Sequence, residues 1–458
     1  MKNILFLFSL ICVVACQKNE QFTLLSGTIQ NADSTKITLE GINFSKEISM
    51  KNGIFADTLT LPYEGLYNLI LNDENMFFIY LENGFQLNFV TESDDFYQKM
   101  NFTGTGSAEN NFLVLKRTVE QKTYGLLTSR AEAIKVYSVD ENAFLAKGDL
   151  YKKEMNQRIK DSKIPNSKFL ATETKDIDFY ILKMNDNFPR YHAFFTENPD
   201  FKPSANFPKL TADFNMDDET LYLNSFSYQT LTSVAFQEYM YDESDDKSLP
   251  IEKGFAKLKT LSSKRIQSDL VKMMSYEFNG ETPNLEAVYK EMMAYAVDEQ
   301  FKKKITEKFE ILKNITKGSP SPTFDYENVN GGTTSLESLK GKLVYIDVWA
   351  TWCGPCIGEI PALKEVEKTY HGKNIEFVSI SIDDRKDHEK WKKMVADKEL
   401  KGIQLFADAD WKSDFVKKYA IDGIPRFILL DAEGKIVNAD APRPSDPKLI
   451  DLLTKNGL

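Results

Sequence analysis

The sequence predicts a multidomain protein in which an N-terminal all-β, sandwich-like domain precedes a helical middle region and a C-terminal α/β domain. Three observations lead to this fold class. Short alternating apolar segments fill the first part of the chain, and apolar residues three or four apart fill the middle. Strand-like and helix-like segments then alternate after Gly318-Ser319-Pro320-Ser321-Pro322. With 458 residues, of which 42% are hydrophobic, the chain can form several cores, and we expect domains at 20–105, 106–317 and 318–458.

The first residues have the pattern of a targeting segment. Lys2 precedes a mostly apolar run from Ile4 to Val14, about the length of a signal-peptide core. The run ends in Val13-Val14-Ala15-Cys16, which resembles the lipobox of bacterial lipoproteins. We therefore expect residues 1–15 to be a lipoprotein signal peptide and Cys16 to be lipidated, because ordinary secretory cleavage would leave an odd exposed thiol. The resemblance implies a protein of the cell envelope, lipid-anchored and facing the periplasm or the cell surface.

Residues 20–105 read as β structure. The segment from Thr35 to Leu39 alternates between polar and apolar residues, as a half-buried strand does. Asn52-Gly53 and Asn83-Gly84 each separate two strand-like segments, and this dipeptide between strands predicts a β-hairpin. The region shows no catalytic constellation.

Residues 106–317 read as helical, with breaks at Asn198-Pro199 and Asn279-Gly280. The predicted helices run from Asn110 to Ile134, Glu141 to Lys160, Ser167 to Phe188, Asp218 to Tyr241, Lys259 to Met274 and Leu285 to Leu312. The acidic run after Tyr241 lacks the spacing of a calcium loop and predicts a solvated linker. The region contains no chemistry of its own and is interpreted as a spacer or a partner surface.

The last region alternates strands and helices. Predicted strands cover Phe324 to Val329, Lys342 to Ala350, Ile375 to Ile382, Arg426 to Leu430 and Lys435 to Asn438. Predicted helices cover Ser335 to Leu339, a segment beginning at the cysteine pair, His388 to Leu400, Trp411 to Tyr419 and Asp446 to Leu453.

The candidate active site is Trp352-Cys353-Gly354-Pro355-Cys356, where a buried strand leads into a helix. Two intervening residues place both sulfurs in one turn, close enough for a disulfide. A helix N-terminus favours a thiolate over a thiol, so Cys353, at the exposed start of the turn, is the expected nucleophile and Cys356 the resolving thiol. The alternative is half of a zinc site, but the chain has only four cysteines and three scattered histidines. We expect dithiol–disulfide exchange and no metal.

Residues 318–458 resemble the TlpA/ResA-like group of thioredoxin-fold thiol–disulfide oxidoreductases. The resemblance rests on residues 341–350, the cysteine motif, Glu359-Ile360-Pro361 and Gly423-Ile424-Pro425. It implies that Pro425 is the cis-proline facing the cysteine pair, although most X–Pro bonds are trans. It also implies that Trp352, Gly354, Pro355, Ile424 and Pro425 bind the substrate.

Two carboxylates are candidates for proton transfer. Asp347 stands in an otherwise apolar strand, where a carboxylate costs free energy unless it has a role or a partner. The resemblance gives Asp347 the role of deprotonating Cys356, and it makes Glu359 a second candidate. Members of the ResA-like group often lack the aspartate, so which of the two carboxylates moves the proton is left open. The simpler alternative is that Asp347 is a polar residue at a strand end.

The predicted function is that of an envelope thiol:disulfide oxidoreductase, with reduction of protein disulfides as the favoured direction because Gly354-Pro355 is the pair found in thioredoxin. The resemblance implies disulfide-containing envelope proteins such as apocytochrome c as substrates, a role in cytochrome c maturation, a DsbD/CcdA-like membrane electron donor and no cofactor. A net charge of −11 argues against nucleic-acid binding. The alternatives are a disulfide oxidase or isomerase, and a ligand- or partner-binding envelope lipoprotein with a redox-regulatory domain. Ala350 replaces the threonine expected in a peroxiredoxin.

Overall fold

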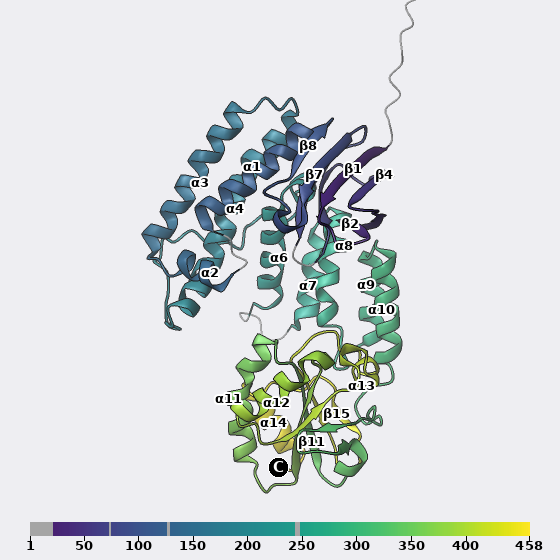
Figure 1. Ribbon diagram of the computed structural model, residues 1–458. Coiled ribbons are helices and arrows are strands. Elements are labelled where there is room, and N and C mark those ends of the chain that lie inside the picture. Colours follow the sequence, from purple (N-terminus) through teal and green to yellow (C-terminus); the bar gives the residue numbers. More distant parts are fainter. Residues whose placement is uncertain (1–21, 73–74, 126–128, 243–247) are drawn as a thin grey trace, which may run out of the picture. The chain divides into compact units, whose positions relative to one another are not determined.

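The computed structural model describes residues 22–72, 75–125, 129–242 and 248–458, and the chain divides into two compact units, Met1–Glu238 and Tyr239–Leu458 (Figure 1). The division falls inside the stretch that the sequence assigns to helices. Cys16 and the predicted signal peptide lie outside the described residues. Among the described residues no helix is both long and apolar enough to span a bilayer.

The first unit begins with two four-stranded sheets. One sheet has the order β4-β1-β7-β8 and the other the order β3-β2-β5-β6. The strands are β1 (Thr23–Gln30), β2 (Lys36–Gly41), β3 (Phe44–Ser49), β4 (Ile54–Leu59), β5 (Gly65–Ile70), β6 (Met76–Leu81), β7 (Gln86–Glu92) and β8 (Asn101–Gly104). In β1 every second residue is buried, as expected when one face of a sheet covers a core. The sheet-rich start of the chain is therefore confirmed.

Both predicted hairpins are wrong. The turn at Asn52-Gly53 forms, with both residues at positive φ and Lys51 and Ile54 bonded across it. The strands on its two sides then separate, since β3 pairs with β2 and β4 pairs with β1. The turn at Asn83-Gly84 likewise joins β6, paired with β5, to β7, paired with β1 and β8. Each tight turn carries the chain from one sheet to the other.

Helices complete the first unit. They are α1 (Ser107–Tyr124), α2 (Arg130–Tyr137), α3 (Glu141–Asp161), α4 (Ser167–Phe195), α5 (Glu219–Asn224) and α6 (Phe226–Met240), the last of which crosses the division. The predicted helix from Asp218 to Tyr241 is two helices. Ser225 interrupts it, because its hydroxyl accepts a hydrogen bond from the Tyr228 N–H at 3.0 Å and so begins a new helix.

The second unit starts with α7 (Pro250–Thr260), α8 (Lys264–Met273), the 3₁₀ turn η2 (Met274–Tyr276), α9 (Leu285–Tyr295) and α10 (Glu299–Leu312). The predicted helix from Leu285 to Leu312 is again two helices, α9 and α10, and the predicted helix from Lys259 to Met274 joined the end of α7 to α8. Asp298 accepts hydrogen bonds from the backbone of Gln300 and Phe301, which starts α10 inside the run predicted as one helix. Ser263 caps α8 in the same way.

The α/β domain follows, with a seven-stranded sheet of order β10-β9-β13-β12-β11-β14-β15. Its strands are β9 (Asp325–Asn328), β10 (Thr333–Ser335), β11 (Leu343–Trp349), β12 (Ile375–Ser381), β13 (Ile403–Phe406), β14 (Arg426–Leu430) and β15 (Ile436–Asn438). Its helices are η3 (Leu336–Leu339), α11 (Gly354–Thr369), η4 (Arg385–Asp387), α12 (His388–Asp397), η5 (Asp410–Lys412), α13 (Asp414–Lys418) and α14 (Lys448–Lys455).

The core that positions the site lies between this sheet and two helices. Tyr345 of β11 and Phe427 of β14 stack with ring centroids 5.6 Å apart. Leu363 of α11 and Leu449 of α14 pack against the same cluster. Because strand residues alternate in direction, Asp347 lies on the same face of β11 as Tyr345, the face that α11 covers.

Candidate functional site

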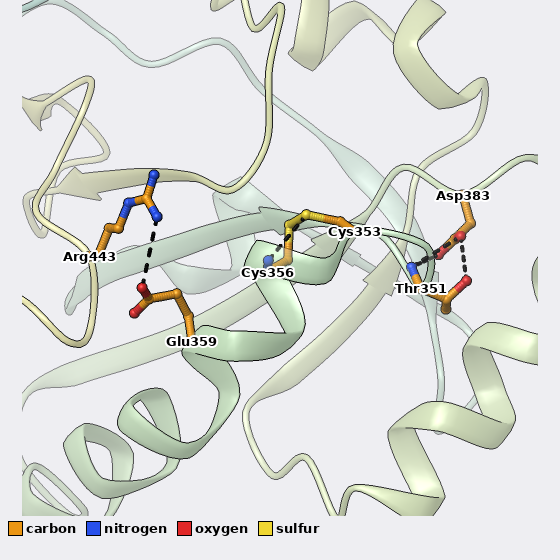
Figure 2. Close-up of a disulfide and its surroundings, with 6 residues drawn as sticks. All are labelled: Thr351, Cys353, Cys356, Glu359, Asp383 and Arg443. Carbon is orange, nitrogen blue, oxygen red and sulfur yellow. Dashed lines mark hydrogen bonds and ion pairs between the residues drawn. A yellow bond between two sulfur atoms is a disulfide. The ribbon is translucent and has the colours of Figure 1, made fainter. Parts of the chain in front are cut away.

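The two cysteines of the motif form a disulfide where β11 leads into α11 (Figure 2). All seven residues of β11 are buried, so the strand fixes the start of the loop firmly. Cys353 is the N-cap residue of α11, and its sulfur accepts a hydrogen bond from the Cys356 N–H at 3.2 Å. The sulfur therefore lies where the unpaired N–H groups of the helix converge, an arrangement that stabilises a thiolate after reduction.

The exposure expected for Cys353 is not observed. Both cysteines are 4% exposed, whereas the preceding Trp352 is 52% exposed. In the disulfide form the Cys353 sulfur is turned inward, bonded to Cys356 and capping the helix. The surface presented at the motif consists of the exposed residues Trp352, Gly354 and Pro355. These are three of the residues predicted to bind the substrate.

Asp347 is a buried carboxyl beside the cysteine-bearing helix. It is paired in register with Ser379 of β12. Burial raises the pKa of Asp347 to about 8; the Ser379 hydroxyl opposes this shift, and the charges of Glu359 and Glu367 add to it. A carboxyl with this pKa exchanges its proton near neutral pH, as a proton acceptor in catalysis must.

Glu359 points away from the cysteines toward a neighbouring loop. Its carboxylate accepts hydrogen bonds from the Ser445 backbone N–H at 3.1 Å and from the Ser445 hydroxyl at 2.9 Å. The Arg443 guanidinium lies 3.9 Å away, as the dashed line in Figure 2 marks. Glu359 thus ties α11 to the loop after β15, and it influences Asp347 through its charge.

A second buried carboxylate holds the other side of the cysteine loop, and the sequence analysis did not single it out. Asp383 is fully buried and accepts hydrogen bonds from the Thr351 N–H at 2.9 Å, the Thr351 hydroxyl at 2.7 Å and the Ser381 hydroxyl at 2.8 Å. Figure 2 shows Asp383 and Glu359 on opposite sides of the disulfide. The signal that could have found it is related to the one used for Asp347: a carboxylate shortly after an apolar strand, where Asp347 stands within one.

The Ile424–Pro425 peptide bond is cis, as the resemblance implied. In the antiparallel pairing of β11 with β14, Val348 lies opposite Arg426. Pro425 therefore stands at the end of β11 from which the cysteine loop begins. Ile424 and Pro425 are both partly exposed. Trp352 packs beside Trp411, a neighbour the sequence did not indicate, with ring centroids 6.3 Å apart.

A redox-active cysteine pair that caps a helix at the end of a central strand, with a cis-proline at the same sheet end, defines a thioredoxin-like thiol–disulfide oxidoreductase. The comparisons agree. The Redoxin family model matches residues 316–452. The thiol-disulfide oxidoreductase ResA of Bacillus subtilis is 29% identical over 127 residues, which cover 27% of this chain and 67% of ResA. The thioredoxin-like protein YneN of the same organism is 30% identical over 122 residues, 27% of this chain and 69% of YneN.

Among solved structures, the thioredoxin domain of a thiol-disulfide oxidoreductase from Bacteroides vulgatus is 31% identical. The match covers 31% of this chain and 96% of that one, with a TM-score of 0.28. The Redoxin match and the similarity to YneN and ResA show that the chain belongs, through its C-terminal domain, to the TlpA/ResA-like thioredoxin family of thiol–disulfide oxidoreductases. It spans about two thirds of the length of ResA.

Proposed function

We propose that the protein is a membrane-anchored envelope reductase of protein disulfides that uses the Cys353/Cys356 dithiol. The observation that carries this proposal is the Cys353 sulfur at the N-terminus of α11, hydrogen-bonded by the Cys356 N–H. The position of Pro425 at the same end of the sheet supports it. Gly354-Pro355 between the cysteines is the pair of a reducing thioredoxin, which favours reduction over oxidation.

The reaction is a pair of thiol–disulfide exchanges. The Cys353 thiolate attacks one sulfur of the substrate disulfide, so that a mixed disulfide forms and the other substrate sulfur leaves as a thiolate. The Cys356 thiolate then attacks the Cys353 sulfur, which forms the intramolecular disulfide and releases the second substrate thiolate. The substrate gains two electrons and two protons, and the enzyme dithiol loses them. No cofactor takes part.

The remaining site residues have supporting roles in this proposal. Asp347 takes the proton from Cys356 through a relay, because its raised pKa lets it accept and return protons near neutral pH. The negative charge of Glu359 raises the pKa of Asp347 further. The Ile424–Pro425 backbone pairs with an extended substrate segment, and Trp352, Gly354 and Pro355 form the contact surface beside the disulfide.

The oxidised enzyme must be reduced again, so the proposal includes a dithiol electron donor of the DsbD/CcdA-like class in the membrane. We propose Cys16 as the lipidation site after removal of residues 1–15, with the protein held in the envelope facing the periplasm. Disulfide-containing envelope proteins, apocytochrome c among them, are the proposed substrates. The N-terminal sheets are proposed to pack as a sandwich, which the contact between Phe77 of β6 and Phe102 of β8 supports, with ring centroids 6.4 Å apart.

The test is the reduction potential of the Cys353–Cys356 pair, measured by equilibrating the chain from Gln17 onward in dithiothreitol redox buffers and trapping free thiols. We expect a value near thioredoxin's, roughly −270 mV. A value well above roughly −200 mV would make the protein an oxidase or isomerase instead. Replacing both cysteines by serine separates the enzyme from a binding module, because binding of a partner would survive the change and disulfide exchange would not.

A further inference from the structure

The cis-proline loop contacts the helices that precede the α/β domain within the second unit. Figure 1 shows α9 and α10 ending at this domain. The Lys308 ammonium of α10 donates to the Asp422 carboxylate at 2.9 Å and to the Ser275 carbonyl of η2 at 2.7 Å. The Lys308 and Asp422 side chains are only 5% and 18% exposed. Since a buried charge is costly without its partner, this ion pair fixes the chain three residues before Pro425.

The other flank of the cis bond is held by the same helical segment, which runs from η2 to the end of α10 (residues 274–312). Arg426 directly follows Pro425, and its guanidinium contacts the Asp440 carboxylate at 2.8 Å. The Asn279 amide donates to the second oxygen of Asp440 at 2.6 Å. The Ala439 N–H donates to Glu281 at 3.0 Å. Residues after η2 therefore anchor the segment that follows the cis-proline.

Tyr276 covers the loop between these two anchors. Its ring carbons lie 3.4 and 3.6 Å from the position that a Cβ of Gly423 would occupy, so the ring lies beside the side of Gly423 that carries no side chain. The Tyr276 side chain is nevertheless 60% exposed. An aromatic ring that lies beside Gly423, the residue before Ile424, and also faces solvent is placed to contact a peptide lying along the loop.

We propose that the helical segment supplies part of the binding site for protein disulfides, with Tyr276 contacting the substrate peptide and Lys308 positioning the cis-proline loop. This inference rests on the proposed function and deepens it. The favoured substrate is a disulfide in an extended peptide with an apolar side chain next to the cystine, which Tyr276 can cover. A small disulfide without a peptide has nothing to place against Tyr276.

The test compares a protein disulfide with a small one in single-turnover reactions of the reduced chain from Gln17 onward. Insulin and hydroxyethyl disulfide are the probes, and the concentration dependence of the rate gives a half-saturating concentration and a limiting rate. We expect Tyr276→Ala to raise the half-saturating insulin concentration about tenfold, as loss of an aromatic contact at an interface does. The limiting rate, the rate with hydroxyethyl disulfide and the reduction potential should all stay unchanged.

The matched control is Tyr239→Ala, which removes another exposed tyrosine of the same unit, one that lies under Lys257. For the loop anchor, Lys308→Met should also weaken insulin binding, and Lys308→Arg should restore much of it because it keeps the charge. Lys313→Met is the control near the end of the same helix, since Lys313 forms a salt bridge with the exposed Glu310 and lies over the Phe309 ring, both within the helical segment itself. Should Lys308→Met fail to fold, the Tyr276→Ala variant still tests the inference, because Tyr276 is exposed and its loss should not disturb folding.

The outcomes separate the two proposals. An insulin half-saturation unchanged by Tyr276→Ala would refute this inference, as would an equal loss of rate with both disulfides. A wild-type chain that reacts with neither disulfide would instead refute the proposed function itself.

Discussion

Replacing Asp347 by asparagine should stabilise the second unit, and the gain should grow with pH. Burial raises the pKa of Asp347 from 3.8 to about 8. Between these two pH values the folded state therefore keeps a proton that the unfolded state has already released. Stability contributed by the protonated carboxyl is present at low pH and is lost as pH rises through this window. At about 1.4 kcal/mol per pKa unit, the ionised Asp347 lowers the unfolding free energy of the second unit by about 6 kcal/mol above pH 8.

Tryptophan fluorescence isolates this effect. All four tryptophans, Trp349, Trp352, Trp391 and Trp411, lie in the α/β domain, so their emission reports the unfolding of the second unit alone. Urea unfolding of the oxidised wild-type chain and of Asp347→Asn, between about pH 4 and pH 9, gives the difference in unfolding free energy at each pH. The difference should be near its minimum at pH 4 and rise toward about 6 kcal/mol at pH 9.

The control for this series is Glu365→Gln on α11, because Glu365 is exposed and pairs only loosely with Lys368, 3.7 Å away. Its difference from wild type should stay flat and small across the same pH range. If Asp347→Asn also gave a flat difference, burial would not raise the pKa of Asp347, and its proposed role as a proton carrier near neutral pH would be refuted.

Four further substitutions test the cysteine pair, Asp383 and the proposed lipid anchor. Cys356→Ser should accumulate a stable mixed disulfide between Cys353 and a substrate protein, visible on non-reducing gels, whereas Cys353→Ser should form none. Asp383→Ala should lower the unfolding free energy of the second unit by about 3 kcal/mol, because the Thr351 N–H and hydroxyl lose their buried acceptor; tryptophan-monitored urea unfolding measures it, and a loss under about 1 kcal/mol would contradict the role given to Asp383. Cys16→Ser should move the protein from the membrane fraction to the soluble fraction, and retention in the membrane would contradict lipidation at this residue.

The local features of the site could be predicted from the sequence because their determinants are close together in the chain. The cysteine pair, the strand before it and the helix after it lie within residues 343–369, whereas the cis bond before Pro425 was implied only by the family resemblance that includes Gly423-Ile424-Pro425. The element order of the α/β domain was also largely right, although the strands β10 and β13 were missed. The four residues of β13 form a strand by pairing in parallel with β12 and antiparallel with β9, and no local pattern marks them.

Predictions of features that depend on residues far apart in the chain were wrong or missing, for a physical reason. The turn at Asn52-Gly53 is encoded by two residues, but whether its flanking strands pair depends on β1 and β2 competing for them. The helical region was interpreted as a spacer or partner surface because the sequence shows no chemistry there. In the sequence, Lys308 resembles any other lysine of an amphipathic helix. Its partner Asp422 is 114 residues away.

The buried charges of the second unit lie where the two loops of the redox site are held. Asp383 holds the loop before Cys353, and the Lys308–Asp422 and Arg426–Asp440 pairs hold the two flanks of the cis-proline. Each of these groups costs desolvation free energy that an apolar side chain of similar size would not. A hydrogen-bonded ion pair, however, fixes position in a way that apolar packing does not, and disulfide exchange requires three sulfurs to meet in one geometry. We therefore interpret these charges as the means by which the fold keeps the cysteine loop and the cis-proline loop in register, with the helical segment as part of that frame.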